Sequence, residues 1–139
     1  MQTFISNSEK ETKQLAARLA HDITKGVIAL SGELGAGKTT FVQGFAKGLG
    51  IKDRIISPTF VFIRQHKIPG RTSILYHIDL YRLENLKDFG QFGIEEIWLN
   101  LNNIVLIEWA EKIENLLPQN TLSIKIKKGK GNIRSITVG

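Results

Sequence analysis

The sequence predicts an α/β domain in which a mixed β-sheet is flanked by helices. Two short and uninterrupted apolar segments, residues 27–30 and 104–107, have the composition of strands that are buried on both faces of a sheet. Segments with helical spacing of apolar residues lie on both sides of the first of these strands. Two pairs of strand-like segments, each joined by a glycine-containing turn, predict antiparallel hairpins. Hairpins and buried strands together give a mixed sheet.

Composition indicates an ordinary globular protein, and we expect residues 1–139 to form one domain. The amino terminus lacks the basic start and long apolar stretch of a signal peptide, and no run approaches the roughly 18 apolar residues of a membrane span. The absence of cysteine excludes disulfides and thiolate metal sites. We therefore expect a cytoplasmic protein that does not bind a membrane.

In chain order, the first elements are a strand and a helix. Phe4 and Ile5 predict a short opening strand. Residues 8–11 have the pattern of a capping box, in which the Glu11 carboxylate reaches back to the backbone N–H of Ser8. The helix that follows is rich in alanine and leucine and is expected to end at Gly26.

A second helix is predicted over residues 38–49, and Gly50 is placed to end it. Its apolar stripe consists of Phe41, Val42, Phe45, Ala46 and Leu49. Residues 59–67 and 73–80 then flank a Pro-Gly turn and predict an antiparallel hairpin.

The last third of the chain predicts short helices at residues 93–99 and 110–117, and a final hairpin formed by residues 121–128 and 132–138. The net charge of +6 favours acidic partners such as nucleotides, nucleic acid or an acidic protein surface. Part of this excess lies on the final hairpin, at Lys125, Lys127, Lys128, Lys130 and Arg134. We interpret it as a solvated hairpin, with a docking surface for RNA or a partner protein as the alternative.

A phosphate-binding loop lies between the first buried strand and the second helix. Residues 32–39 match the pattern G-x-x-x-x-G-K-[ST] without a gap. Its glycines let backbone N–H groups curl around phosphate oxygens, Lys38 brings a positive charge to them, and the Thr39 hydroxyl is a Mg²⁺ ligand. The expected nucleotide-binding residues are Glu33, Leu34, Gly35, Ala36, Gly37, Lys38, Thr39 and Thr40.

A P-loop threonine that holds Mg²⁺ needs a carboxylate at the end of a neighbouring strand. Glu108 ends the apolar segment 104–107, so we assign it to the magnesium site. Asp79 ends a segment of alternating pattern, which suggests a more peripheral strand. We expect Asp79 to position the metal or the attacking water, and we list Lys38, Asp79 and Glu108 as catalytic candidates.

ATP is favoured over GTP as the nucleotide. The chain lacks an Asn-Lys-x-Asp guanine signature, since residues 85–88 have a different order, and it lacks the Asp-x-x-Gly switch of small GTPases. Trp109 is expected to anchor a core or interface beside Glu108, or to help close the nucleotide site. His77 lies two residues before Asp79, so we expect it at most to tune a neighbouring group.

With these motifs, the chain resembles the TsaE family (older name YjeE), bacterial ATPases of tRNA threonylcarbamoyladenosine biosynthesis. The resemblance runs nearly end to end. Beyond the P-loop it rests on Ser57-Pro58-Thr59-Phe60, on residues 77–82 (His-Ile-Asp-Leu-Tyr-Arg), on residues 93–96 and on Glu108-Trp109. His66 is a departure, because many members have an aromatic residue there.

This resemblance implies a P-loop NTPase-like fold and further site residues. Thr59 would lie on a switch-like loop near the γ-phosphate and is our fourth catalytic candidate, and Thr12 would lie near the adenine. The family works with TsaB-like and TsaD-like proteins, the latter transferring threonylcarbamoyl to tRNA. ATP hydrolysis would support that assembly, and contact with tRNA would come through the complex.

Two other functions are compatible with the residues. A small-molecule or nucleoside kinase shares the P-loop, although the chain has little length for the arginine-bearing lid that such kinases need. An RNA-binding module with a regulatory ATP site would be supported by the basic final hairpin alone.

Overall fold

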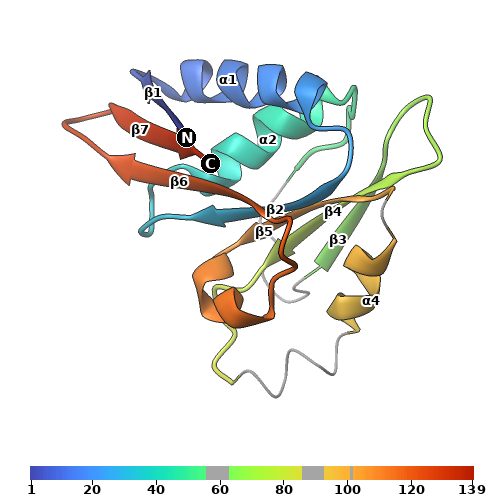
Figure 1. The fold of residues 1–139 in the computed structure, drawn as a ribbon. Coiled ribbons are helices and arrows are strands. Elements are labelled where there is room, and N and C mark those ends of the chain that lie inside the picture. Colours follow the sequence, from blue (N-terminus) through green and yellow to red (C-terminus); the bar gives the residue numbers. More distant parts are fainter. Residues whose placement is uncertain (56–62, 86–92, 101) are drawn as a thin grey trace.

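In the computed structural model, residues 1–55, 63–85, 93–100 and 102–139 are described, and they form a mixed seven-stranded sheet with helices on both faces (Figure 1). The strands are β1 (Gln2–Ser6), β2 (Gly26–Ser31), β3 (Ile63–Lys67), β4 (Ile74–Asp79), β5 (Ile104–Glu108), β6 (Leu122–Lys128) and β7 (Arg134–Val138). Their order across the sheet is β1-β7-β6-β2-β5-β4-β3. The predicted α/β class with a mixed sheet is confirmed.

The centre of the sheet is parallel and its two ends are antiparallel. Strand β2 pairs with β5 on one side and β6 on the other, and β4 continues the parallel set beyond β5. The β6–β7 and β3–β4 hairpins add the antiparallel pairs, with β1 beside β7. The apolar runs of β2 and β5 are buried because both faces of these strands are covered, as their composition predicts.

Two apolar layers cover the sheet. Helices α1 (Glu9–Asp22) and α2 (Lys38–Gly48) lie on one face, and α4 (Ile94–Leu99) and the 3₁₀ helix η1 (Ala110–Leu116) lie on the other (Figure 1). The predicted apolar stripe of α2 is buried throughout. Among the helices of the described ranges, none has the length and apolar character needed to cross a bilayer.

The start and the end of α1 differ from the prediction. The Ser8 hydroxyl accepts the N–H of Glu11 as a capping box requires, but the Glu11 carboxylate accepts from the N–H of Asn7 rather than from that of Ser8. The helix ends at Asp22 with Ile23 as its C-cap, and Gly26 is the first residue of β2. Glycine is favoured at this first residue of β2 because its φ is +107°, which other residues rarely adopt.

The expectation that the strand before Asp79 is peripheral is wrong. Strand β4 is paired on both sides, with β5 and with β3, and His77 and Asp79 are buried. Successive side chains of β4 point to opposite faces of the sheet, and both faces are buried: Leu75 packs in one apolar layer and Ile78 in the other. The predicted hairpin itself is confirmed over residues 63–67 and 74–79.

Helices α1 and α2 approach each other closely at two glycines of α2. A Cβ at Gly44 would lie 2.5 Å from the Cα and the carbonyl oxygen of Lys13, and one at Gly48 would lie 2.6 Å from the oxygen of Ala17. Backbone atoms cannot move aside as a flexible side chain can. These glycines therefore set the distance of α1 from the helix that begins at the phosphate loop.

We predict that Gly44→Ala destabilises the protein although alanine is the better helix former. The added methyl group meets backbone of α1, and overpacking of this kind costs about 1–3 kcal/mol. Urea unfolding should show the loss, with Lys47→Ala on the exposed side of the same helix as a control that stays near wild type. A more stable Gly44→Ala variant would contradict the close packing.

Candidate functional site

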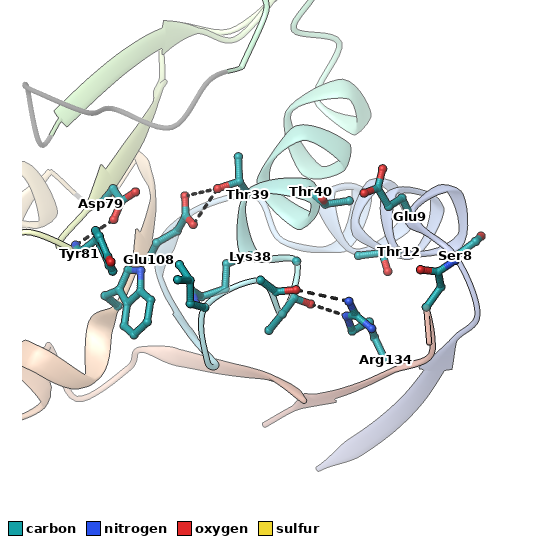
Figure 2. A pocket seen from close by; sticks show the side chains of 16 residues that line it. Ser8, Glu9, Thr12, Lys38, Thr39, Thr40, Asp79, Tyr81, Glu108 and Arg134 are labelled. Carbon is teal, nitrogen blue, oxygen red and sulfur yellow. Dashed lines mark hydrogen bonds between the residues drawn. The ribbon is translucent and has the colours of Figure 1, made fainter. Parts of the chain in front are cut away.

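A pocket of about 390 Å³ opens at the carboxyl ends of the central strands, where the phosphate loop joins β2 to α2. Its volume lies in the range of small-molecule sites. Figure 2 shows that its walls come from distant parts of the chain: the first turn of α1, the start of α2, the ends of β4 and β5, and Arg134 of β7. Ligands of parallel α/β sheets bind at this edge.

The phosphate loop owes its curl to glycine. Gly35 and Gly37 have φ of +79° and +106°, which side-chain-bearing residues rarely adopt. A Cβ at Gly32 would lie 2.5 Å from the carbonyl oxygen of Ile126 in β6, so the start of the loop lies directly on the neighbouring strand. The Ala36 N–H donates to the Glu33 carbonyl at 3.0 Å and closes the turn. The loop is thus a compact backbone cradle.

The Lys38 ammonium lies at the mouth of this cradle. Its Nζ donates to the carbonyl oxygens of Gly32 and Glu33, at 2.5 and 3.1 Å, and lies 3.9 Å from the centroid of the Trp109 ring. Burial lowers the pKa of Lys38, and nearby carboxylates, Glu108 foremost, oppose that shift. A desolvated cation held in this way can pair strongly with an incoming phosphate.

Thr39 and the two predicted acids converge beside the lysine. The Thr39 hydroxyl donates to both carboxylate oxygens of Glu108, at 3.0 and 3.3 Å (Figure 2). Asp79 lies opposite Glu108 in the register of β4 and β5, and its Oδ1 accepts the Tyr81 N–H at 2.9 Å. The two acids lie side by side because their strands are adjacent and parallel and end at the same edge of the sheet.

This donor set suits Mg²⁺ better than a metal that binds to protein ligands alone. The described ranges contain no group of three His, Cys, Asp or Glu side chains that could hold a metal ion. Mg²⁺ keeps several waters and typically binds one or two carboxylates together with substrate phosphates. The Thr39 hydroxyl and the Glu108 carboxylate, already in contact, are oxygen donors of the required kind.

His77 forms a buried pair with Glu108, which sequence reasoning did not identify. Its Nε2 lies 2.5 Å from Glu108 Oε2, and the two side chains are 0% and 3% exposed. Since a carboxylate only accepts, the Nε2–H is the donor, while Nδ1 is buried without a hydrogen-bond partner among the described residues. Thr39 and His77 thus hold the Glu108 carboxylate from two sides.

Most of the predicted nucleotide-binding residues line this one pocket: Thr12, Leu34, Gly35, Ala36, Gly37, Lys38, Thr39 and Thr40. Glu33 contributes its carbonyl to Lys38, and its side chain is exposed. The Thr12 hydroxyl is buried against Ser6 Oγ at 2.7 Å. Thr59 lies outside the described residues. Ligand contacts of all these residues stay predictions.

The prediction that Arg134 belongs to a solvated basic hairpin is wrong. Its guanidinium turns to the phosphate loop and donates to the carbonyl oxygens of Gly35 and Ala36 (Figure 2). Nothing local in the sequence indicates this contact, because the partners are 98 and 99 residues apart. The four lysines of the hairpin are exposed as expected.

Comparisons with known proteins agree over nearly the whole chain. The family model described as threonylcarbamoyl adenosine biosynthesis protein TsaE matches residues 6–136. A tRNA threonylcarbamoyladenosine biosynthesis protein TsaE from Bacillus subtilis is 42% identical over 129 residues, which cover 92% of this chain and 78% of the relative. The protein of that name from Treponema pallidum is 38% identical over 135 residues, covering 96% and 97%.

The fold is similar to that of a solved relative. A crystal structure of YdiB from Bacillus subtilis superposes with a TM-score of 0.79 at 36% identity, and the match covers 99% of this chain and 83% of that one. The whole pocket, from the first turn of α1 to Arg134, lies within the matched residues.

The buried His77–Glu108 pair predicts non-additive losses of stability. In His77→Leu the carboxylate loses a donor that water cannot replace, and a hydrogen bond to a charged group contributes about 1.5–3 kcal/mol. Removing both partners in His77→Leu/Glu108→Leu leaves neither member of the buried pair without a partner, and only the half-buried Thr39 hydroxyl loses its acceptor. Urea unfolding should therefore give the double variant a smaller loss than the sum of the two single variants. Strictly additive losses would show that the pair is not coupled.

Proposed function

The chain belongs to the TsaE family of threonylcarbamoyl adenosine biosynthesis proteins, and from that premise we propose that residues 1–139 form one magnesium-dependent ATPase domain that acts in tRNA modification. The observation that carries the ATPase proposal is the convergence of Lys38, Thr39 and Glu108 at the mouth of the phosphate loop. A lysine ammonium beside a hydroxyl that contacts a carboxylate supplies the groups that ATP and Mg²⁺ require together.

In this proposal the triphosphate binds along the start of α2. The backbone N–H groups of the loop and the positive end of the helix dipole favour the anion, and the Lys38 ammonium pairs with the terminal phosphates. The Trp109 ring contacts the Lys38 ammonium and packs against the Tyr81 ring at a tilt of 47°, with ring centroids 5.3 Å apart. With a nucleotide bound, these rings would cover part of the phosphate end of the pocket and so strengthen the charge pairing there.

Thr39 and Glu108 would hold Mg²⁺, which neutralises charge on the phosphate oxygens during phosphoryl transfer. The hydrogen bond between the Thr39 hydroxyl and Glu108 Oε1 would hold these two oxygens near each other before the ion binds. Asp79, opposite Glu108, would orient the metal shell or the attacking water. Hydrolysis would then depend on positioning and electrostatic stabilisation rather than on covalent chemistry of the protein. A role of Thr59 near the γ-phosphate stays a prediction from the family resemblance.

Hydrolysis would support an assembly of TsaB-like and TsaD-like proteins in the cytoplasm, with tRNA reached through that complex. The chain supplies phosphate binding, a metal site and two carboxylates. Among the described residues that line the pocket, the lysine and arginine side chains are those of Lys38 and Arg134, and both are bonded to loop carbonyls. Fast turnover needs further charge stabilisation, so we expect slow hydrolysis by the isolated chain and activation by its partners.

Lys38→Ala should weaken Mg-ATP binding by about ten- to a hundred-fold, because a charge-assisted hydrogen bond contributes about 1.5–3 kcal/mol. Isothermal titration calorimetry measures the affinity directly. Lys47→Ala, an exposed lysine on the same helix, removes the same charge away from the pocket and should bind like wild type. Wild-type affinity in Lys38→Ala would remove the phosphate-loop assignment.

Steady-state phosphate release should rise when TsaB-like and TsaD-like partners are added at matched salt, since assembly completes the catalytic environment. The same reactions should be followed with labelled ATP, so that any phosphorylated acceptor is detected. An unchanged rate without a detectable complex would contradict the accessory role. Transfer of the label to a small-molecule acceptor would identify the chain as a kinase.

A further inference from the structure

The side chain of Arg134 connects the last strand of the sheet to the phosphate loop. Its Nε donates to the Ala36 carbonyl at 3.0 Å, and its Nη2 donates to the Gly35 carbonyl at 3.3 Å. Figure 2 shows the guanidinium pointing at the loop from the side of the pocket opposite Glu108. Two consecutive peptide groups of the loop are therefore held by one planar fork.

The arginine is itself held in place by the turn that precedes it. Its Nη1 donates to the carbonyl oxygens of Gly131 and Ile133, both at 2.9 Å. The guanidinium thus bonds four backbone carbonyls, two on its own hairpin and two on the loop. Because it is fixed at one end by the β6–β7 hairpin, it can fix the loop at the other.

Because the peptide bond is planar, the contact of Arg134 with the loop carbonyls also fixes the direction of the loop N–H groups. In a planar trans peptide the C=O and the following N–H point in opposite directions. Drawing the Ala36 carbonyl to Arg134 therefore directs the Gly37 N–H away from Arg134. Drawing the Gly35 carbonyl the same way directs the Ala36 N–H into its bond with Glu33. Both carbonyl oxygens are kept on the outside of the cradle.

Without such a tether the loop has freedom to lose this arrangement. Gly35 and Gly37 have positive φ, and glycine samples both signs of φ more readily than other residues. A peptide that flips would present a carbonyl oxygen to the phosphate in place of an N–H. Ordering the loop on binding would then reduce affinity, whereas a loop that is ordered in advance avoids that cost.

We propose that Arg134 is a positioning residue that preorganises the phosphate loop for the nucleotide. The proposal rests on the proposed function, since it concerns binding of ATP phosphates. It assigns Arg134 to the loop peptides and not to the nucleoside. Affinity for the phosphate chain should then depend on the fork of Arg134, whatever base the ligand has.

The test is a titration of the full chain with Mg-ATP and, by competition, with Mg-tripolyphosphate, which has no nucleoside. Arg134→Ala should bind both about tenfold more weakly, which corresponds to about 1.4 kcal/mol. Arg134→Lys keeps the charge but lacks the fork, so it should recover little of the loss. Lys130→Ala removes an exposed charge from the same hairpin and should bind both ligands like wild type.

Three results would overturn the proposal: wild-type affinity in Arg134→Ala, a loss confined to ATP, or full recovery in Arg134→Lys. The second would place Arg134 on the nucleoside, and the third would reduce its role to charge. Thermal unfolding of each variant shows that titrations are made on folded protein, and if Arg134→Ala does not fold, Arg134→Lys decides. Failure of the wild type to bind ATP would instead contradict the proposed function.

Discussion

The constraint on which the rest of this structure depends is that the phosphate loop must stay curled, with the Gly35 and Ala36 carbonyls turned outward to Arg134, before any anion is present. Glycine permits the curl, at Gly35 and Gly37, but does not enforce it. The surroundings enforce it: the start of the loop lies directly on the Ile126 carbonyl, Lys38 bonds the carbonyls of Gly32 and Glu33, and Arg134 bonds those of Gly35 and Ala36. The buried parallel strands hold these supports in place.

The order of the strands then brings the acids to the loop. Because β5 lies between β2 and β4 in parallel register, Leu30, Glu108 and Asp79 end side by side at one edge of the sheet. Glu108 is further fixed by Thr39 and His77, so its carboxylate is oriented before a metal ion binds. The metal site that we propose therefore follows from the register of β2, β5 and β4 and from the burial of Glu108.

Sequence predicted what depends on local pattern and missed what depends on distant contact. The buried strands, the phosphate loop and Glu108 follow from runs of apolar residues and a gapless motif. The alternating pattern before Asp79 predicts a peripheral strand, whereas both faces of β4 are covered by apolar layers. The role of His77 beside Glu108 depends on strand pairing, and that of Arg134 on a contact across 98 residues, so neither has a local signal.

The most direct test of the central claim is a crystal structure of the full chain with Mg²⁺ and a non-hydrolysable ATP analogue. A preorganised site predicts that the loop backbone and the Arg134 bonds are unchanged, with the terminal phosphates on Lys38 and the ion between Thr39 and Glu108. A nucleotide bound away from the loop, or a loop whose Gly35 and Ala36 carbonyls have left Arg134 to accommodate the phosphates, would contradict the account.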